Sequence, residues 1–313
     1  MKPRALVTGA AGFIGSNLCR RLVADGADVV GFDDLSDARP DALRDLPEVR
    51  LIEGDLRDEA AVASAAQGCS AIFHQGAKRS VPRSLAEPVL TADVNIRGTL
   101  NVLLAGRDEG AVVVSASSSS VYGDQDRFPL RESDEPRPRS PYAMSKLAAE
   151  VCCAGMYRSY GVRALSLRYF NVYGPGQDPT SAYALVVPLF ATACLRGERP
   201  VIHGDGEQAR DFTFIDDVVE ANLQASRAPD EAFGRAYNIG GGREPTSVNE
   251  LLALIAQEVG AHPEPVFEPA RAGDVRTTHA DVSLARTYLG YEPVVGIEEG
   301  IRRTVASCRE MAA

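Results

Sequence analysis

The sequence predicts an α/β protein with a doubly wound parallel sheet and a smaller second lobe of mixed α/β structure. Short apolar runs alternate with helical segments between Ala5 and Tyr169, and these runs are apolar on successive residues. Strands covered by helices on both faces have this character. A glycine-rich turn after the first run and a hydroxyl-rich segment after a later one lie where such folds bind ligands.

Six apolar runs are expected to form the strands. In chain order they are ALVTG, ADVVGFDD, VRLIEGD, AIFHQGA, VVVSASS and ALSLRYF. We predict a dinucleotide-binding domain at residues 1–170 and a substrate-binding lobe at 171–313, with segments of the second part crossing back to the first. Pro, Gly and charged residues are denser in the second part, and SVNELLALIAQEVG is its clearest amphipathic helix.

Composition and charge exclude several classes of protein. The formal net charge is −10 and no run of Lys or Arg exceeds a pair, which argues against nucleic acid or an anionic membrane as a partner. We find no signal sequence and no stretch near the roughly 20 apolar residues that span a bilayer. The six cysteines lack CxxC spacing and the four histidines are far apart, so we expect neither a metal site nor disulfides. These features predict a cytoplasmic protein.

The glycine-rich turn has the form of a dinucleotide-binding site. Gly9, Gly12 and Gly15 stand between the first strand and a helix, and this spacing lets a pyrophosphate approach N–H groups at the positive helix end. The next strand ends at Asp33, where an acid can bind the adenosine ribose. Because a carboxylate repels a 2′-phosphate, NAD is predicted rather than NADP. Asp55 is a candidate for the adenine edge, with a helix cap as the alternative role.

A helix start supplies two candidate catalytic groups. Tyr142 and Lys146 lie at i and i+4 on one face of a helix capped by Ser140. For a tyrosine to act as a base near neutral pH, its pKa must fall by about three units, or about 4 kcal/mol. A lysine charge at about 4 Å supplies about 4 kcal/mol at an effective dielectric of about 20. A serine from Ser117–Ser120 can share the proton as an alcohol becomes a ketone.

Together these motifs resemble the extended short-chain dehydrogenase/reductase family, and within it the nucleotide-sugar 4-epimerases. The resemblance covers nearly the whole chain through TGAAGFIGS, GFDDLS, GDLRD, SSSSVYGD, SPYAMSK, RYFNVYGP, GDGEQARDF and RAGDV. It implies a Rossmann fold, a tightly held NAD that is reduced and reoxidised within one turnover, and a UDP-sugar substrate. It also implies a homodimer that uses the helix of Tyr142 and its neighbour near residues 91–105.

The resemblance implies three catalytic groups, namely Tyr142 as the base, Lys146 as its electrostatic partner and ligand of the nicotinamide ribose, and Ser118 as the hydroxyl that shares the C4 proton. The residues assigned to the cofactor are Gly9, Gly12, Phe13, Ile14, Gly15, Asp33, Asp34, Leu35, Ser36, Asp55, Leu56, Gln75, Ala77, Lys78, Asn95, Tyr142, Lys146 and Tyr169. The residues assigned to the substrate are Arg79, Arg83, Ser118, Ser119, Ser120, Asn171, His203, Arg210, Arg271 and Thr278.

Individually placed arginines suit an acidic protein that binds an anion. By the resemblance, Asn171, Arg210 and Arg271 hold the nucleotide diphosphate. His203 occupies a place where related enzymes pack an aromatic residue on the uracil, and a surface histidine is the alternative role.

The motifs leave the sugar open among glucose, glucuronate and N-acetylglucosamine. Arg79 and Arg83, with the hydroxyls of Ser119–Ser120, suit a C6 carboxylate. Against this, Asp178 stands where some glucuronate 4-epimerases have an arginine. Thr278 matches a pocket position whose bulk is linked to tolerance of N-acetyl groups, and its small side chain does not decide the question.

Three other functions are weighed against epimerisation. Dehydratases of the family usually carry an acidic pair before VYG, whereas this segment is all serine, which argues against 4,6-dehydration. A reductase or dehydrogenase of the same fold is the second enzyme hypothesis, and Asp33 disfavours an NADPH-driven version. A nonenzymatic NAD-sensing protein is the third, but such members usually lose the tyrosine and lysine that are present here.

Overall fold

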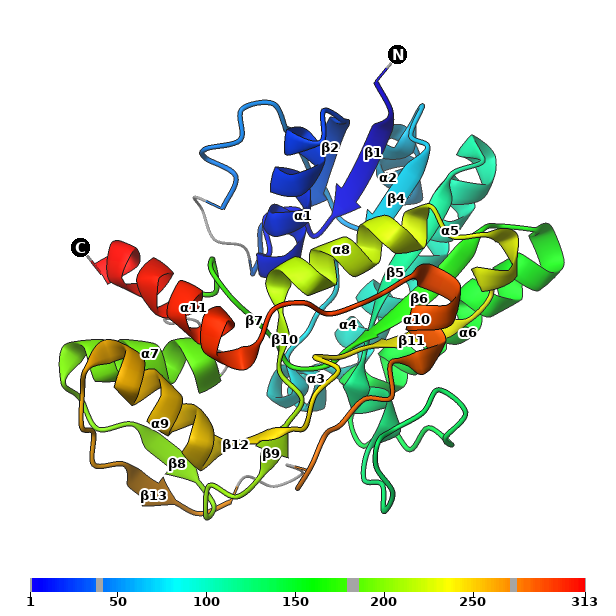
Figure 1. Cartoon of the computed structure of the whole chain (residues 1–313). Coiled ribbons are helices and arrows are strands. Elements are labelled where there is room, and N and C mark those ends of the chain that lie inside the picture. The colour runs from blue at the N-terminus through cyan, green and yellow to red at the C-terminus, as the bar shows by residue number, and fades with distance from the viewer. Residues whose placement is uncertain (1, 38–41, 179–185, 271–274, 313) are drawn as a thin grey trace.

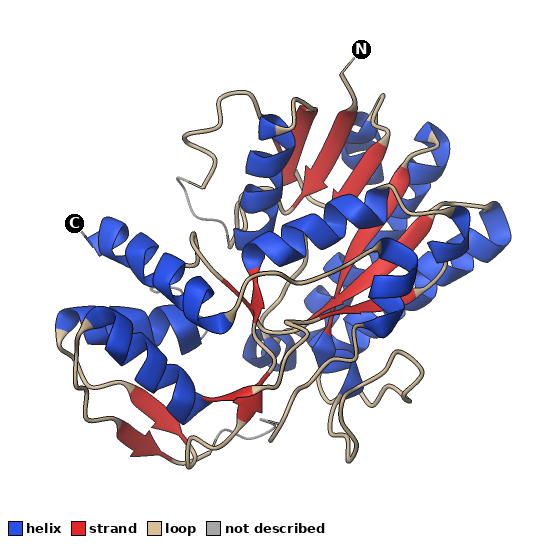
Figure 2. Cartoon of the chain, viewed as in Figure 1, coloured by secondary structure: helices blue, strands red, loops and turns tan. Residues whose placement is uncertain are grey.

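The computed structural model describes residues 2–37, 42–178, 186–270 and 275–312, and a parallel β-sheet forms its largest element (Figure 1 and Figure 2). Within these residues seven strands pair in the order β11-β6-β5-β4-β1-β2-β3, and each neighbouring pair is parallel. The strands are β1 (Arg4–Thr8), β2 (Asp28–Asp33), β3 (Arg50–Glu53), β4 (Ala71–His74), β5 (Val112–Ser118), β6 (Ala164–Tyr169) and β11 (Ala236–Ile239). The predicted doubly wound fold is confirmed, and all six predicted runs form strands.

Alternate residues of the strands enter two hydrophobic cores, one on each face of the sheet. In β1, Ala5 and Val7 belong to one core and Leu6 to the other, as the two-residue period of a strand requires. Five helices cover the two faces, with α1 (Phe13–Ala24) and α8 (Ile215–Ser226) on one and α2 (Glu59–Ala66), α5 (Gly98–Glu109) and α6 (Pro141–Tyr160) on the other (Figure 1). This double covering explains why successive strand residues are apolar.

The second half of the chain returns to the sheet. β11 pairs with β6 in parallel, and α8 packs against α1, where Arg21 and Glu220 form an ion pair of 3.0 Å. α10 (Ser283–Leu289) packs on β11. The division of the chain at residue 170 stays a prediction.

Smaller elements complete the molecule. The two-stranded sheets are β7 (Val172–Tyr173) with β10 (Thr213–Phe214), β9 (Ala209–Arg210) with β12 (Thr246–Ser247), and β8 (Val201–His203) with β13 (Val266–Glu268). The remaining helices are α3 (Val81–Ala86), α4 (Pro88–Ala92), a π-helix (Asp93–Arg97), 3₁₀ turns (Ser119–Tyr122 and Asp230–Ala232), α7 (Val186–Arg196), α9 (Val248–Val259) and α11 (Ile297–Ala312). α7, α9 and α11 pack on one another in the smaller lobe.

The ends of two helices confirm the expectations from the sequence. α9 is the predicted amphipathic helix, and it begins with a capping box between Ser247 and Glu250. α6 begins at Pro141, and the Ser140 side chain accepts a hydrogen bond from Ala143 N at 3.1 Å. In the described part of the chain no helix is long and apolar enough to cross a membrane. All six cysteines are free thiols.

His74 is a buried neutral side chain that joins three elements beneath the site. Its Nδ1 lies 2.8 Å from Thr8 Oγ1 of β1, and its Nε2 lies 3.0 Å from Thr99 Oγ1 of α5. Burial lowers the pKa of His74 to about 3, and the positive charge of Lys146 acts in the same direction. The folded protein therefore holds this ring unprotonated at any ordinary pH.

This burial predicts a specific sensitivity to acid. Below about pH 6.5 the unfolded chain binds a proton at His74 and the folded chain does not, so stability is lost as the pH falls toward 3. Between pH 6.5 and pH 5 the free energy of unfolding falls by about 2 kcal/mol because of this group. Urea unfolding at several pH values measures it.

His74→Gln should remove this component of the pH dependence. His262→Gln is the matched control, because His262 is exposed and its replacement should leave the acid loss unchanged. An identical pH dependence of unfolding in all three proteins would contradict the assignment.

Candidate active site

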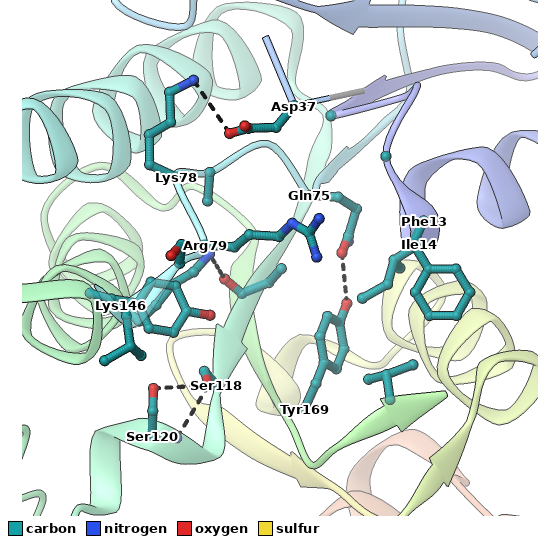
Figure 3. A pocket seen from close by; sticks show the side chains of 18 of the residues that line it. Phe13, Ile14, Asp37, Gln75, Lys78, Arg79, Ser118, Ser120, Lys146 and Tyr169 are labelled. Carbon is teal, nitrogen blue, oxygen red and sulfur yellow. Dashed lines mark hydrogen bonds and ion pairs between the residues drawn. The ribbon is translucent and has the colours of Figure 1, made fainter. Parts of the chain in front are cut away.

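A cavity of about 1210 Å³ runs along the carboxyl ends of the parallel strands, the edge at which doubly wound folds bind ligands. Pockets for one small ligand are typically about 300–1000 Å³, so this cavity has room for a dinucleotide and a second ligand. The predicted residues that line it are Gly9, Gly12, Phe13, Ile14, Gly15, Asp33, Asp34, Ser36, Asp55, Leu56, Gln75, Ala77, Lys78, Arg79, Ser118, Ser119, Ser120, Tyr142, Lys146, Tyr169, Asn171, Arg210 and Thr278. Nine of these are labelled in Figure 3, which shows the cavity from close by.

The glycine turn is shaped by close backbone approach. Gly9 has a φ of +65°, and a Cβ there would lie 2.7 Å from Gly76 N, in the loop after β4. A Cβ on Gly15 would lie 2.0 Å from the Gly9 carbonyl oxygen. α1 begins at Phe13 with Gly12 as its N-cap and no side chain capping it. The first N–H groups of α1 therefore remain available to a pyrophosphate, and the turn fits a dinucleotide.

Asp33 is held in place beside this turn by main-chain donors. Its Oδ2 accepts from Ala11 N at 2.9 Å and its Oδ1 from Leu35 N at 2.8 Å. Burial raises the pKa of Asp33, and these two N–H groups oppose the rise. Leu35 contributes through its main chain, because its side chain is exposed and is not among the described residues that line the cavity.

A chain of ion pairs crosses the mouth of the cavity at this end. Lys78 Nζ lies 3.2 Å from Asp34 Oδ2 and 3.8 Å from Asp37 Oδ2, and Figure 3 shows Lys78 facing Asp37. Arg83 Nη1 lies 3.2 Å from Asp37 Oδ1, and its Nε lies 3.0 Å from Glu87. Among the described residues Arg83 is not part of the cavity wall. Its guanidinium faces Asp37, on the side of the cavity that carries Asp34, and its predicted contact with the sugar stays a prediction.

Two other cofactor candidates, Asp55 and Asn95, occupy different places relative to the cavity. Asp55 lines the cavity and binds Arg57 through the main-chain N–H and the guanidinium. It does not cap α2, because Asp58 does. Asn95 is buried behind the wall, where its amide binds the main chain of Lys78 at 2.8 and 3.1 Å. Asn95 thus supports the loop after β4 without lining the cavity.

α6 carries both predicted catalytic side chains to the cavity. Tyr142 and Lys146 line it from successive turns. Lys146 Nζ donates to the Ala116 carbonyl oxygen of β5 at 2.8 Å. Burial lowers the pKa of Lys146 to about 8, although Cys153 and Glu150 act in the opposite direction.

The electrostatic role predicted for Lys146 stays a prediction, and the structure gives the groups that surround the phenol of Tyr142. Burial raises the pKa of Tyr142 above its usual value. The groups that lower the pKa are the hydroxyl of Ser118, by a hydrogen bond, and the charge of Arg79. Lys146 donates to the main chain of β5 at Ala116, and Arg79 is a second cation in the wall of the cavity. The Arg79 side chain extends into the cavity from the loop after β4 (Figure 3).

The serines after β5 have separate partners. Ser118 Oγ accepts from Ser120 N at 3.2 Å and from Ser120 Oγ at 2.9 Å. Ser117 donates to Glu150 Oε1 at 2.5 Å in the buried interface with α6. Of the serines that line the cavity, Ser118 is the one whose hydroxyl lowers the pKa of Tyr142.

The substrate candidates Asn171 and Thr278 bind each other. Asn171 Nδ2 donates to Thr278 Oγ1 at 2.9 Å and to the Asp211 carbonyl oxygen at 3.0 Å. Arg210, on β9, lines the same end of the cavity, and its Nη1 donates to the Ala209 carbonyl oxygen at 2.9 Å. The end opposite the glycine turn thus presents a cation and fixed polar groups.

Two predicted substrate residues are not brought to the cavity. His203 ends β8, its Nδ1 lies 3.6 Å from Glu268 Oε2, and it is not among the described residues of the wall. Its alternative role as an ordinary histidine of the smaller lobe is favoured. Arg271 lies outside the described residues.

The residues that sequence reasoning missed include Asp37 in the wall and Asn222 behind it. Asp37 lines the adenosine end, and its position three residues after Asp34 was a signal for it. Asn222 of α8 is fully buried and hydrogen-bonds to the cavity residues Gln75 and Tyr169. It carried no sequence signal, because it lies far from both partners along the chain.

Comparisons with known proteins agree with this geometry. A family model described as the NAD dependent epimerase/dehydratase family matches residues 5–240. A UDP-glucose 4-epimerase of Mycolicibacterium smegmatis is 42% identical over 309 residues, covering 96% of this chain and 97% of the relative.

Two solved structures extend the likeness to nearly the full length. UDP-glucose 4-epimerase of Thermotoga maritima, crystallised with UDP-glucose, has a TM-score of 0.94 at 37% identity and covers 99% of this chain and 100% of that one. UDP-N-acetylglucosamine 4-epimerase of Methanobrevibacter ruminantium, in complex with UDP-N-acetylmuramic acid, has a TM-score of 0.93 at 34% identity with the same coverage.

Gly9 provides a test of the dinucleotide site. Gly9→Ala should destabilise the fold by about 3 kcal/mol, because left-handed strain and overpacking against the loop after β4 add together. The same change should abolish dinucleotide binding. Gly110→Ala is the matched control, since Gly110 has a φ of +66° but nothing within 4 Å of its Cβ. Urea unfolding and calorimetric titration with NAD measure both effects, and equal losses in the two variants would contradict the close approach.

Proposed function

The chain belongs to the NAD dependent epimerase/dehydratase family, and from that premise we propose that it is an NAD-dependent 4-epimerase of a UDP-sugar. One observation carries the proposal. Tyr142 and Ser118 line one cavity together, and its other end is a glycine turn that fits a dinucleotide. Full-length similarity to 4-epimerases supports the same conclusion.

NAD is the cofactor that the residues fit. The N–H groups at the start of α1 suit its pyrophosphate, and the Asp33 carboxylate suits the ribose hydroxyls of the adenosine. When bound, NAD supplies the reversible oxidation of C4 of the hexose. Lys146 is placed to bind the nicotinamide ribose, because its remaining donors are free to turn to a ligand in the cavity.

In the proposed reaction Tyr142 takes the proton of the C4 hydroxyl and returns it to the C4 oxygen after the 4-keto sugar has presented its other face. Ser118 bridges the phenol and that oxygen, and so shares the proton at both stages. The phenolate that forms is stabilised by the Ser118 hydroxyl and the Arg79 charge. Any further lowering of the pKa of Tyr142 has to come from Lys146 and the oxidised cofactor.

The diphosphate of the substrate is assigned to the end of the cavity opposite the glycine turn. Arg210 supplies a cation there, and Asn171 supplies a fixed amide. Arg271 is retained as a proposed ligand on the resemblance alone. The net charge of −10 makes such local cations necessary for binding an anionic nucleotide.

The sugar remains to be determined. Arg79 reaches the cavity together with Ser119 and Ser120, which suits a C6 carboxylate. Asp178 lines the same cavity and opposes an anion there by its charge. Thr278 contributes a small hydroxylated side chain to the wall. These contacts are compatible with UDP-glucose, UDP-glucuronate and UDP-N-acetylglucosamine.

Simple measurements distinguish epimerisation from two other functions. A nucleotide-sugar reductase or dehydrogenase would exchange NAD with solution and change the absorbance of NADH stoichiometrically with turnover. A nonenzymatic NAD sensor would bind the cofactor and convert no sugar. The presence of Tyr142 and Lys146 favours an enzyme over the sensor. The all-serine segment Ser117–Ser120 disfavours dehydration.

We predict that Tyr142→Phe abolishes turnover and retains NAD, because the change removes the phenolic oxygen and leaves the cofactor wall in place. The assay incubates the protein with UDP-glucose, UDP-glucuronate and UDP-N-acetylglucosamine in turn and separates the sugar isomers by chromatography. At least one should equilibrate with its galacto isomer while NADH absorbance stays constant.

Tyr160→Phe is the matched control, since Tyr160 is an exposed tyrosine at the far end of α6. It should epimerise at the rate of the unchanged protein. Undiminished turnover in Tyr142→Phe would dispose of the catalytic assignment, and turnover that consumes NAD stoichiometrically would favour a dehydrogenase.

A homodimer built on α5 and α6 is proposed as the working assembly. Exposed apolar side chains gather on the adjacent helices α3 to α6, namely Leu85, Val89, Leu100, Met144 and Val151. A monomer seldom leaves such a group uncovered. The cytoplasmic location expected from the sequence is retained as part of the proposal.

Light scattering after gel filtration should give about twice the chain mass of 33.4 kDa. Val151→Glu should yield a monomer, because it places a charge in the middle of the apolar group. Val294→Glu should remain a dimer, since Val294 is equally exposed but lies just before α11. If both variants remain dimers, the interface lies on another surface of the protein.

A further inference from the structure

Three side chains from distant parts of the sequence form a closed ring of hydrogen bonds behind the cavity. Gln75 Nε2 donates to Asn222 Oδ1 at 3.0 Å. Asn222 Nδ2 donates to Tyr169 OH at 2.9 Å, and Tyr169 OH has two acceptors, Gln75 Oε1 at 3.2 Å and Asn222 Oδ1 at 3.1 Å. Gln75 follows β4, Tyr169 ends β6, and Asn222 lies on α8. Figure 3 shows the bond between Gln75 and Tyr169 beside Phe13 and Ile14.

A backbone carbonyl determines the orientation of both side-chain amides in this ring. Asn222 Nδ2 also donates to the Val218 carbonyl oxygen at 2.7 Å, one turn earlier in α8. A carbonyl oxygen only accepts, so the amide nitrogen of Asn222 must face it and Oδ1 must face Gln75. Gln75 therefore presents its nitrogen to Asn222 and its oxygen to Tyr169. α8 thus selects one of the two orientations of the Gln75 amide.

The ring lies directly against the dinucleotide turn. Gln75 N donates to the Thr8 carbonyl oxygen at 3.1 Å, and a Cβ on Gly9 would lie 2.9 Å from the Gln75 carbonyl carbon. Both Gln75 and Tyr169 line the cavity, whereas Asn222 is fully buried. Because a side-chain amide has two N–H groups, Gln75 keeps one donor beyond the bond to Asn222.

We propose that Asn222 is a positioning residue for the bound dinucleotide, acting by orienting the Gln75 amide and the Tyr169 hydroxyl on the cavity wall. This inference rests on the proposed use of NAD. Asn222 belongs to the half of the chain that also carries Arg210, so this half contributes to both the substrate end and the cofactor wall. The docking of α8 does not depend on Asn222 alone, because Val218, Ala221 and Leu223 of this helix are buried in the core.

The experiment is a calorimetric titration of cofactor-free protein with NAD, without any sugar nucleotide. Asn222→Leu should weaken NAD binding about tenfold, which corresponds to the loss of a buried hydrogen-bond partner. Tyr169→Phe should have a similar effect. Because both act through one ring, the double variant should lose much less than the hundredfold that independent effects would give.

Tyr237→Phe is the matched control. Its hydroxyl is buried and donates to the Ala232 carbonyl oxygen at 2.8 Å, away from the cavity. It should lower the thermal midpoint but leave NAD affinity within twofold. If Asn222→Leu does not fold, Asn222→Ser replaces it, since a serine can still bond to the Val218 carbonyl but cannot reach Gln75.

A folded Asn222 variant with unchanged NAD affinity would overturn the inference, and so would fully additive effects in the double variant. A positioning role also predicts that kcat/KM for the UDP-sugar recovers at saturating NAD, whereas a general loss of structure would not be rescued. Failure of the proposed function gives a different result: the unchanged protein would bind NAD and convert no sugar, or bind no NAD at all.

Discussion

The docking of α6 on the ends of the parallel strands is the constraint on which the active site depends. Lys146 donates to a main-chain carbonyl of β5, and one turn later Glu150 accepts from Ser117 and, at 2.9 and 2.7 Å, from Arg168. A buried charge that loses its partner costs several kcal/mol, so the helix cannot slide or rotate along the sheet without a large loss of stability. Tyr142, two turns before Glu150 on the same face, is thereby held beside the serines that follow β5.

The same interaction extends to the second half of the chain. Arg168 donates to Tyr122 OH at 2.8 Å, and that hydroxyl donates to Asn238 Oδ1 of β11 at 2.6 Å. On the other side of β6, Asn222 of α8 contacts the wall near the glycine turn. The residues after β6 therefore form part of the Rossmann domain as well as the substrate lobe. A polar network that is satisfied throughout gives the cavity two rigid walls, one from each half of the chain.

The parts of the fold and site that could be predicted depend on short spacings. Six strands were visible as apolar runs, and the helix of Tyr142 was visible from its cap and its first residue. β11 escaped prediction because Ala236–Ile239 is a short segment that becomes a strand by pairing with β6. Asn222 escaped because a buried amide on a helix has no distinctive neighbours in sequence. Its partners are supplied by the packing of α8, which no local pattern encodes.

The sequence by itself determined the dinucleotide turn, the acid after the second strand and the shared face of Tyr142 and Lys146, because each follows from backbone geometry within a few residues. Only the tertiary structure decided which acidic side chain or cavity wall each arginine side chain contacts. Arg79 lines the cavity, whereas Arg83, four residues later on α3, pairs with Asp37. The direction of a long side chain depends on how its loop or helix is placed against the rest of the protein, and spacing along the chain carries no information about that.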